Sequence, residues 1–279
     1  MALKPFFQGR LIAIGGNEDK SDQLLVLKRV VQEIGKPDFK VGIVTTASEE
    51  PEQRAKDYQA VFTALGAAEI VILDIRTRAQ ANDKAIAKTL KDLDLIFLAG
   101  GDQLRLTTIL GGSRILEAMH HKLDTGALIA GTSAGAAVFS DTMIYEGSSE
   151  EGLVKGKVLT TSGFGFVENI IFDTHFMARG RLGRLIQIVT TNPTCIGVGI
   201  GEDSGVLLKG DETLEVIGTG QVLIVDGCDI GHSNIMDIQL GGPIAVENVR
   251  IHSLVKSYGF DFKTRKFIAP IVTEKKESP

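Results

Sequence analysis

The first half of the chain alternates between short apolar runs and stretches with helical periodicity. The apolar runs occur at residues 11–14, 41–44, 69–73, 95–99 and 127–130. Strands of about five apolar residues that alternate with helices are typical of a parallel sheet covered on both faces. Right-handed crossovers then produce a doubly wound arrangement. The sequence therefore predicts an α/β fold built on a mostly parallel sheet.

The second half has a different pattern. Residues 181–191 have helical spacing and residues 196–200 form another apolar run. From about residue 205, short strand patterns dominate, and Gly-Asp, Asp-Gly and Gly-Gly turns separate them. We expect antiparallel strands that extend or flank the main sheet. Because no linker or repeat interrupts the chain, residues 1–279 are predicted to form a single domain with a β-rich C-terminal part.

The start of the first helix is predicted from its flanking residues. Apolar residues recur at helical spacing from Leu24 to Ile34, and Gly35 follows them. Serine is a preferred N-cap and glycine a preferred C-terminal residue. We therefore expect the helix to be capped by Ser21 and to end at Gly35.

Composition excludes several classes of function. The 279 residues are 43% hydrophobic, which is enough for a large core, and the net charge of −5 argues against general nucleic-acid binding. Cys195 and Cys228 have neither Cys-x-x-Cys nor metal-ligand spacing, so two buried thiols are expected rather than a disulfide or a metal site. The Gly-Gly-Asn-Glu-Asp-Lys segment at residues 15–20 lacks the glycine spacing of nucleotide-binding loops. No metal or other cofactor is expected.

Targeting signals are not evident. No window contains the roughly 18 consecutive apolar residues of a membrane span. Residues 1–10 also lack the apolar stretch of a signal peptide. A cytoplasmic protein without membrane contact is expected.

One strand-to-helix turn carries the strongest chemical signal. The strand Leu128-Ile129-Ala130 is followed by Gly131-Thr132-Ser133-Ala134-Gly135, and a run compatible with a helix begins near Ala134. This is the Gly-x-Ser-x-Gly pattern in the context that presents a nucleophilic serine. Ser133 is therefore the candidate nucleophile. The alternative is a glycine-rich turn in which Ser133 only caps the helix.

A serine nucleophile requires donors for the oxyanion and a base. The backbone N–H groups of Ala134, at the helix N-terminus, and of Gly101, after the strand ending at Ala99, are the candidate donors. Gly15-Gly16 makes a similar strand exit, which we interpret as structural. The histidines are His120, His121, His175, His232 and His252. His175 is the candidate base, because it lies near the end of the strand pattern that begins at Ile170.

The acid that orients the histidine is not fixed by spacing. Glu202 follows the strand at residues 196–200, Asp203 is adjacent to it, and Asp173 lies two residues before His175. Each carboxylate is close to a predicted strand end, where the binding residues of parallel sheets collect. All three remain candidates from the residues alone.

Taken together, these motifs resemble the cyanophycinases, which belong to the serine peptidase family that also contains the aspartyl dipeptidases. The resemblance covers most of the chain. It rests, in order, on Gly100-Gly101-Asp102-Gln103, Gly131-Thr132-Ser133-Ala134-Gly135-Ala136, Asp173-Thr174-His175-Phe176, Arg179-Gly180-Arg181-Leu182-Gly183-Arg184 and Gly199-Ile200-Gly201-Glu202. The arginine-rich segment favours the cyanophycinases over the dipeptidases.

The resemblance implies a triad of Ser133, His175 and Glu202 on a flavodoxin-like core, usually in a homodimer. It also implies cleavage of cyanophycin, a polyaspartate whose side-chain carboxyls carry arginine, to β-aspartyl-arginine dipeptides. One position departs from the pattern, since glutamine commonly stands where this chain has Thr174. Threonine is shorter and has no amide, so either it contacts the substrate differently or the specificity has shifted.

The substrate implied by the resemblance carries free carboxylates and guanidinium groups. Arg181 and Arg184, three residues apart in the predicted helix, are expected to bind carboxylates bidentately. Asp173 and Gln103 are expected to receive a guanidinium. A solvated helix face is the alternative for the two arginines.

Three other interpretations compete with this one. A dipeptidase would release aspartate from short aspartyl or β-aspartyl peptides and leave the polymer intact. An amidotransferase-like domain is disfavoured, because that chemistry uses cysteine where Ser133 stands. A non-catalytic, flavodoxin-like binding module would leave Ser133 unreactive toward serine-directed phosphonates.

Overall fold

The computed structural model describes residues 7–270. Residues 1–6, part of the segment in which no signal peptide was expected, and residues 271–279 lie outside this range. Between residues 7 and 270, no helix combines the length and the apolar character needed to cross a membrane.

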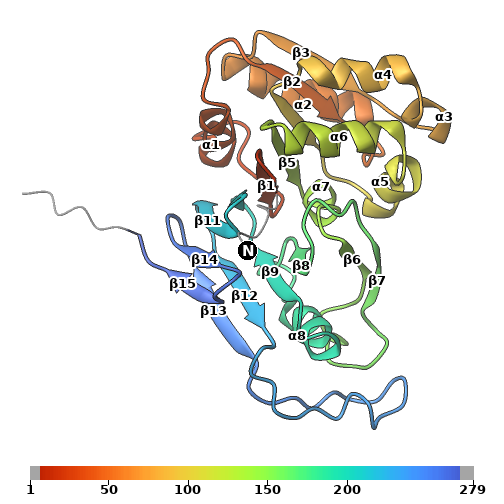
Figure 1. Cartoon of the computed structure of the whole chain (residues 1–279), viewed down its shortest axis with the longest axis vertical. Coiled ribbons are helices and arrows are strands. Elements are labelled where there is room, and N and C mark those ends of the chain that lie inside the picture. Colours follow the sequence, from red (N-terminus) through yellow and green to blue (C-terminus); the bar gives the residue numbers. More distant parts are fainter. Residues whose placement is uncertain (1–6, 271–279) are drawn as a thin grey trace, which may run out of the picture.

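A parallel sheet forms the upper half of the molecule in Figure 1. Its strand order is β3-β2-β4-β5-β1. The strands are β1 (Arg10–Ile14), β2 (Lys40–Val44), β3 (Glu69–Leu73), β4 (Leu95–Leu98) and β5 (Leu128–Thr132). The order β3-β2-β4-β5 corresponds to the 2-1-3-4 order of flavodoxin-like sheets, and β1 occupies the fifth position. The predicted α/β fold class is confirmed.

Antiparallel strands extend this sheet beyond β1. In the described part of the chain they complete a nine-stranded sheet, in the order β10-β11-β14-β15 outward from β1. Their bounds are β10 (Ser204–Lys209), β11 (Thr213–Gly218), β14 (Gly259–Asp261) and β15 (Lys266–Ile268). The expectation of antiparallel strands that extend or flank the main sheet is therefore confirmed.

Helices cover both faces of the parallel strands, because alternate strand residues point to opposite sides. Ile12 and Ile14 belong to one apolar core, which α1 (Leu25–Ile34) and α2 (Pro51–Ala64) complete. Leu11 and Ala13 belong to the other core, under the remaining helices of this half. Those helices are α3 (Arg78–Ala81), α4 (Lys84–Thr89), the 3-10 helix η1 (Leu90–Asp92), α5 (Gln103–Leu110), α6 (Arg114–Asp124) and α7 (Ala134–Ala137).

The start of α1 differs from the prediction. The helix begins at Leu25, and Ser21 lies in the preceding loop. The carboxylate of Asp19 accepts hydrogen bonds from the four successive backbone N–H groups of residues 21–24. Because these N–H groups are already bound by one side chain, the chain turns here before the helix begins.

A second sheet lies below the parallel strands in Figure 1, in the order β13-β12-β9-β8. Its strands are β8 (Ile170–Asp173), β9 (Ile196–Ile200), β12 (Val222–Asp226) and β13 (Arg250–Leu254). The helix α8 (Leu182–Thr191) packs on β9 and β12, and the hairpin of β6 (Thr142–Glu146) and β7 (Leu159–Ser162) lies beside β8. The helix α8 begins one residue later than expected.

The two cysteines are free thiols, as predicted, but their environments differ. Cys195 is buried, whereas Cys228 is exposed. The expectation of two buried thiols is therefore wrong for Cys228. This residue follows β12 in a turn, where its backbone N–H donates to the Asp226 carboxylate.

Candidate active site

Ser133 lies in the turn between β5 and α7. Its backbone adopts φ 53° and ψ −115°, a conformation that costs energy for a residue with a side chain. The flanking glycines allow the chain to pass itself closely: a Cβ atom on Gly131 would lie 2.3 Å from the carbonyl oxygen of Gly135. A Cβ atom on Gly135 would lie equally close to the carbonyl oxygen of Leu98. The small residues therefore permit the tight turn that exposes the serine hydroxyl.

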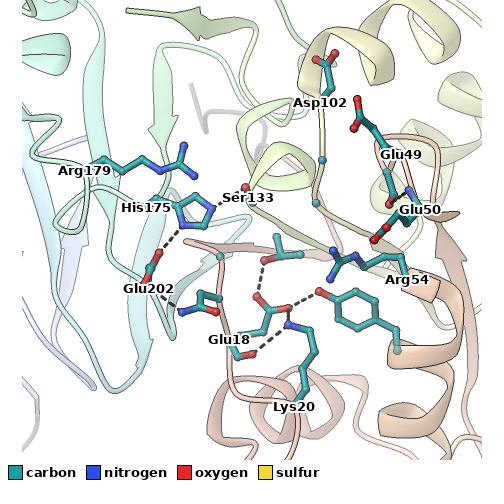
Figure 2. Close-up of a pocket in the computed structure, with 17 residues that line it drawn as sticks. Glu18, Lys20, Glu49, Glu50, Arg54, Asp102, Ser133, His175, Arg179 and Glu202 are labelled. Carbon is teal, nitrogen blue, oxygen red and sulfur yellow. Dashed lines mark hydrogen bonds and ion pairs between the residues drawn. The ribbon is translucent and has the colours of Figure 1, made fainter. Parts of the chain in front are cut away.

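His175 follows β8 and is held from two directions. Its backbone also has a positive φ, of 50°, and its N–H donates to the carbonyl oxygen of Gly15 at 2.8 Å. Its Nε2 atom lies 2.9 Å from Ser133 Oγ, and its Nδ1 atom lies 2.8 Å from Glu202 Oε1. The ring thus links a hydroxyl to a carboxylate, as Figure 2 shows.

Gly16, in the loop after β1, lies against the ring of His175. A Cβ atom at Gly16, whose φ is +95°, would lie 2.4 Å from Cε1 and 2.5 Å from Nε2 of His175. The strand exit interpreted as structural therefore also shapes the space that the imidazole occupies.

Of the three candidate acids, the structure brings Glu202 to the histidine. Its second oxygen accepts a hydrogen bond from Asn17 Nδ2 at 3.2 Å. The bonds from His175 and then Asn17 are the main causes that lower the pKa of Glu202. Asp203 points elsewhere, since its carboxylate accepts from the backbone N–H of Asp19 and from the Thr219 hydroxyl.

The third candidate acid, Asp173, forms an internal ion-pair network. Its side chain is buried and contacts Arg181 at 3.2 Å and Arg184 at 3.0 Å. Burial raises the pKa of Asp173, and the two guanidinium groups act in the opposite direction. Arg184 is itself buried and also donates to the carbonyl oxygen of Gly147.

Asp173, Arg181 and Arg184, which are expected to contact the substrate, all belong to this network. Arg181 precedes α8 as its N-cap residue, so it does not share a helical face with Arg184. Asp173 binds both guanidinium groups, and none of the three side chains lies among the residues that line the cleft beside Ser133. Their placement indicates a role in holding the His175 loop to α8.

Gln103 and Thr174 also lie outside the cleft lining. Gln103 Nε2 donates to the carbonyl oxygen of Tyr145 at 3.3 Å, which ties α5 to β6. Thr174 is buried, and its carbonyl oxygen accepts from Arg181 at 2.8 Å. The structure therefore does not bring these two side chains to the serine.

The backbone donors expected beside the serine have distinctive conformations. Gly101 has φ +149°, and a Cβ atom there would lie 2.2 Å from the carbonyl oxygen of Ala47. Ala134 is the first residue of α7, where backbone N–H groups have no partner within the helix. Within residues 7–270, neither N–H donates to another group of the protein.

A cleft of about 860 Å³ opens beside the serine. It extends from His175 and Glu202 across Ser133 toward the N-terminal end of α2, as Figure 2 shows. Charged side chains of both signs line it. They are Glu18, Lys20, Glu49, Glu50, Arg54, Asp102, Arg179 and Glu202. In the described residues, no group of three or more histidine, cysteine or acidic side chains is arranged to hold a metal ion.

The sequence interpretation missed one whole wall of this cleft. Glu18 and Lys20 lie in the loop after β1, and Arg54 and Tyr58 lie on α2. The available signal was positional: β1 and β2 belong to the same parallel sheet as β5, so the loops after them meet at one edge. Residues 15–20, which lack the glycine spacing of a nucleotide-binding loop, form part of this edge.

Comparisons with known proteins identify a matching family and similar sequences and folds. The family described as Peptidase family S51 matches residues 11–216. A cyanophycinase of Geminocystis herdmanii is 35% identical over 97% of this chain and 100% of that protein. A cyanophycinase of Trichormus variabilis is 37% identical over 90% of this chain and 84% of that protein. A crystal structure of a peptidase from an acI-B1 Actinobacterium is similar to this chain with a TM-score of 0.67 at 22% identity. The match covers 94% of this chain and 100% of the peptidase chain.

Proposed function

The chain belongs to peptidase family S51, and from this premise we propose that it hydrolyses cyanophycin to β-aspartyl-arginine dipeptides. The observation that carries the proposal is the continuous hydrogen-bonded series of Ser133, His175 and Glu202 at a cleft lined by both charge signs. The cyanophycinase relatives, which align with nearly the whole chain, support the choice of polymer. An aspartyl dipeptidase activity and a non-catalytic role are not favoured by these comparisons.

The proposed reaction proceeds through an acyl-enzyme. His175 Nε2 accepts the hydroxyl proton while Ser133 Oγ attacks the backbone carbonyl carbon of the substrate. The same ring then donates this proton to the amide nitrogen as the C–N bond breaks. Water next attacks the ester, His175 accepts its proton, and Ser133 regains a hydrogen as the acid product leaves.

Two further groups assist this proposed sequence. Glu202 holds the imidazole in the tautomer that leaves Nε2 free to accept a proton, and it stabilises the imidazolium. The N–H groups of Gly101 and Ala134 are the proposed donors to the oxyanion of the tetrahedral intermediate. Together with the turn at Ser133, these roles correspond to a nucleophile elbow.

We also propose that residues 1–279 act as one hydrolase domain and assemble as a homodimer. Ser133 follows a strand of the first sheet, whereas His175 follows a strand of the second, so the proposed triad needs both. The homodimer rests on the resemblance to the cyanophycinases. Light scattering of the purified protein tests it, and a monomeric mass at working concentrations would contradict it.

The activity is tested by incubating purified protein with insoluble cyanophycin. We expect the suspension to clear and mass spectrometry to detect β-aspartyl-arginine. Ser133→Ala should abolish both, whereas Ser162→Ala, at an exposed serine of β7, should leave them unchanged. A folded wild-type protein that leaves the polymer intact but cleaves short aspartyl peptides would replace this proposal with a dipeptidase.

A further inference from the structure

Arg54 is a cleft residue whose guanidinium has no hydrogen-bond partner in the described part of the chain. It lies in the first half of α2, and its nearest acidic atom, on Asp57, is 3.8 Å away, beyond hydrogen-bond distance. Its Nε atom is buried without an acceptor. A guanidinium has five N–H donors, so this arrangement leaves the donors of Arg54 available to an incoming acceptor.

Lys20 brings a second cation to the same wall, and its position is fixed by the protein. Its Nζ atom lies 3.1 Å from Glu18 Oε1, donates to the Glu18 carbonyl oxygen at 3.2 Å, and lies 5.3 Å from the ring centre of Tyr58. An ammonium group has three donors, so one remains available. The side chain is 27% exposed and lines the cleft.

Glu18 anchors this wall to the strand that carries the nucleophile. Its carboxylate is buried, accepts from Thr132 Oγ1 at 2.6 Å, and also accepts from the Tyr58 hydroxyl. Thr132 directly precedes Ser133. The position of Lys20 relative to the serine is therefore set by buried hydrogen bonds rather than by a free side chain.

The charge of Arg54 also influences Tyr58, which contacts Glu18 and Lys20. Burial is the main cause that raises the pKa of Tyr58 well above its ordinary value of 10.0, and the charge of Arg54 opposes this shift. The guanidinium therefore lies within electrostatic reach of the phenol that Lys20 also contacts. Figure 2 shows Lys20 and Arg54 together, on the other side of Ser133 from Glu202.

We propose that Arg54 and Lys20 form the subsite that binds a free carboxylate of the substrate. This inference rests on the proposed function, since cyanophycin presents the α-carboxylate of each arginine. Arg54 binds the carboxylate through parallel N–H donors, and Lys20 contributes its remaining N–H. The subsite takes over the role expected of Arg181 and Arg184, whose guanidinium groups are bound by Asp173.

The neighbouring carboxylates limit where this anion can bind. The exposed acidic residues Glu49, Glu50 and Asp102 line the cleft. Two donors of Lys20 are already occupied by the carboxylate and the carbonyl oxygen of Glu18. On the wall formed by the loop after β1 and by α2, a substrate carboxylate is repelled by these acidic side chains and finds uncommitted donors mainly at Arg54. Arg54 is therefore expected to contribute more to binding than Lys20.

Binding to the Ser133→Ala protein, measured by calorimetry, tests the subsite without turnover. The ligands are a short cyanophycin oligomer and the same oligomer with its arginine carboxylates converted to carboxamides. We expect the free acid to bind on the order of 10- to 100-fold more tightly, as hydrogen bonds between charged groups provide. Adding Arg54→Gln should remove most of this preference, whereas Arg54→Lys should keep part of it.

A matched control is available on the same helix. Lys56 is exposed on α2 and does not line the cleft, so Lys56→Gln removes the same charge and should keep the full preference. Equal binding of the two ligands, or an unchanged preference in the Arg54→Gln protein, overturns the subsite and leaves the proposed function standing. Failure of both ligands to bind any folded variant counts instead against cyanophycin as the substrate.

Discussion

Replacing Gly16 with alanine is predicted to disable the active site without unfolding the protein. The added Cβ atom would lie 2.4 Å from His175 Cε1 and 2.5 Å from Nε2, and carbon atoms in contact normally lie about 3.5 Å apart or more. The ring must therefore retreat by about 1 Å. Because Nε2 is the atom that faces Ser133 Oγ at 2.9 Å, this movement breaks the contact between the proposed base and the proposed nucleophile.

The expected loss follows from the size of that displacement. A misplacement of about 1 Å in a catalytic group costs on the order of 100-fold in rate. Gly16 also has φ +95°, so alanine adds backbone strain of about 1 kcal/mol. For a chain of this size, that strain lowers Tm by only about 2–4 °C. We therefore expect kcat/KM to fall at least about 100-fold while the protein remains folded at assay temperature.

Gly66 supplies a matched control, because its φ of +94° is nearly the same and nothing lies within 4 Å of the position its Cβ would take. Gly66→Ala should show the same small decrease in Tm and unchanged hydrolysis of cyanophycin. Labelling by a serine-directed phosphonate gives a second readout, since it depends on activation of Ser133. A Gly16→Ala protein with activity within threefold of that of Gly66→Ala would refute the argument.

Three shorter predictions follow from the same structure. Asn17→Ala removes a donor to Glu202, so kcat should fall several-fold with little change in KM, as steady-state kinetics would show. Folding lowers the pKa of Glu202 below its ordinary value of 4.5, so the ionised carboxylate stabilises the folded protein at higher pH. This contribution is lost as the pH falls through and below that value. The Tm difference between wild type and Glu202→Gln should therefore shrink from about pH 7 to about pH 3. Asp173→Ala leaves two guanidinium groups uncompensated and should lower the free energy of unfolding by about 3–5 kcal/mol, measured by urea denaturation, whereas a loss below about 1 kcal/mol would contradict the network.

The fold could be predicted as far as local patterns extend. The alternation of apolar runs and helical periods identified the parallel strands, and the turn residues indicated antiparallel strands after residue 205. The division into two sheets could not be predicted. Residues 196–200 and 204–209 are both apolar strands separated by three residues, yet β9 and β10 pair into different sheets.

The same limit applies to the candidate site. Ser133 has a local signature, because the glycines that the turn requires are adjacent in sequence. The choice among Glu202, Asp173 and Asp203 has no local signature, since each follows a strand and only the tertiary structure determines which one faces His175. For Arg181 and Arg184, spacing did not indicate that the buried Asp173 carboxylate binds both side chains.

The connection between β9 and β10 explains why both sheets matter to the proposed chemistry. Glu202 lies in this short link, with the second sheet before it and the extended first sheet after it. Its partner His175 follows β8 in the second sheet, and Ser133 follows β5 in the first. A shift of one sheet against the other would change the 2.9 Å and 2.8 Å contacts at once. The bonds of Gly15, Asn17 and Asp19 to the His175 and Glu202 loops oppose such a shift, which gives residues 15–20 a mechanical role in the active site.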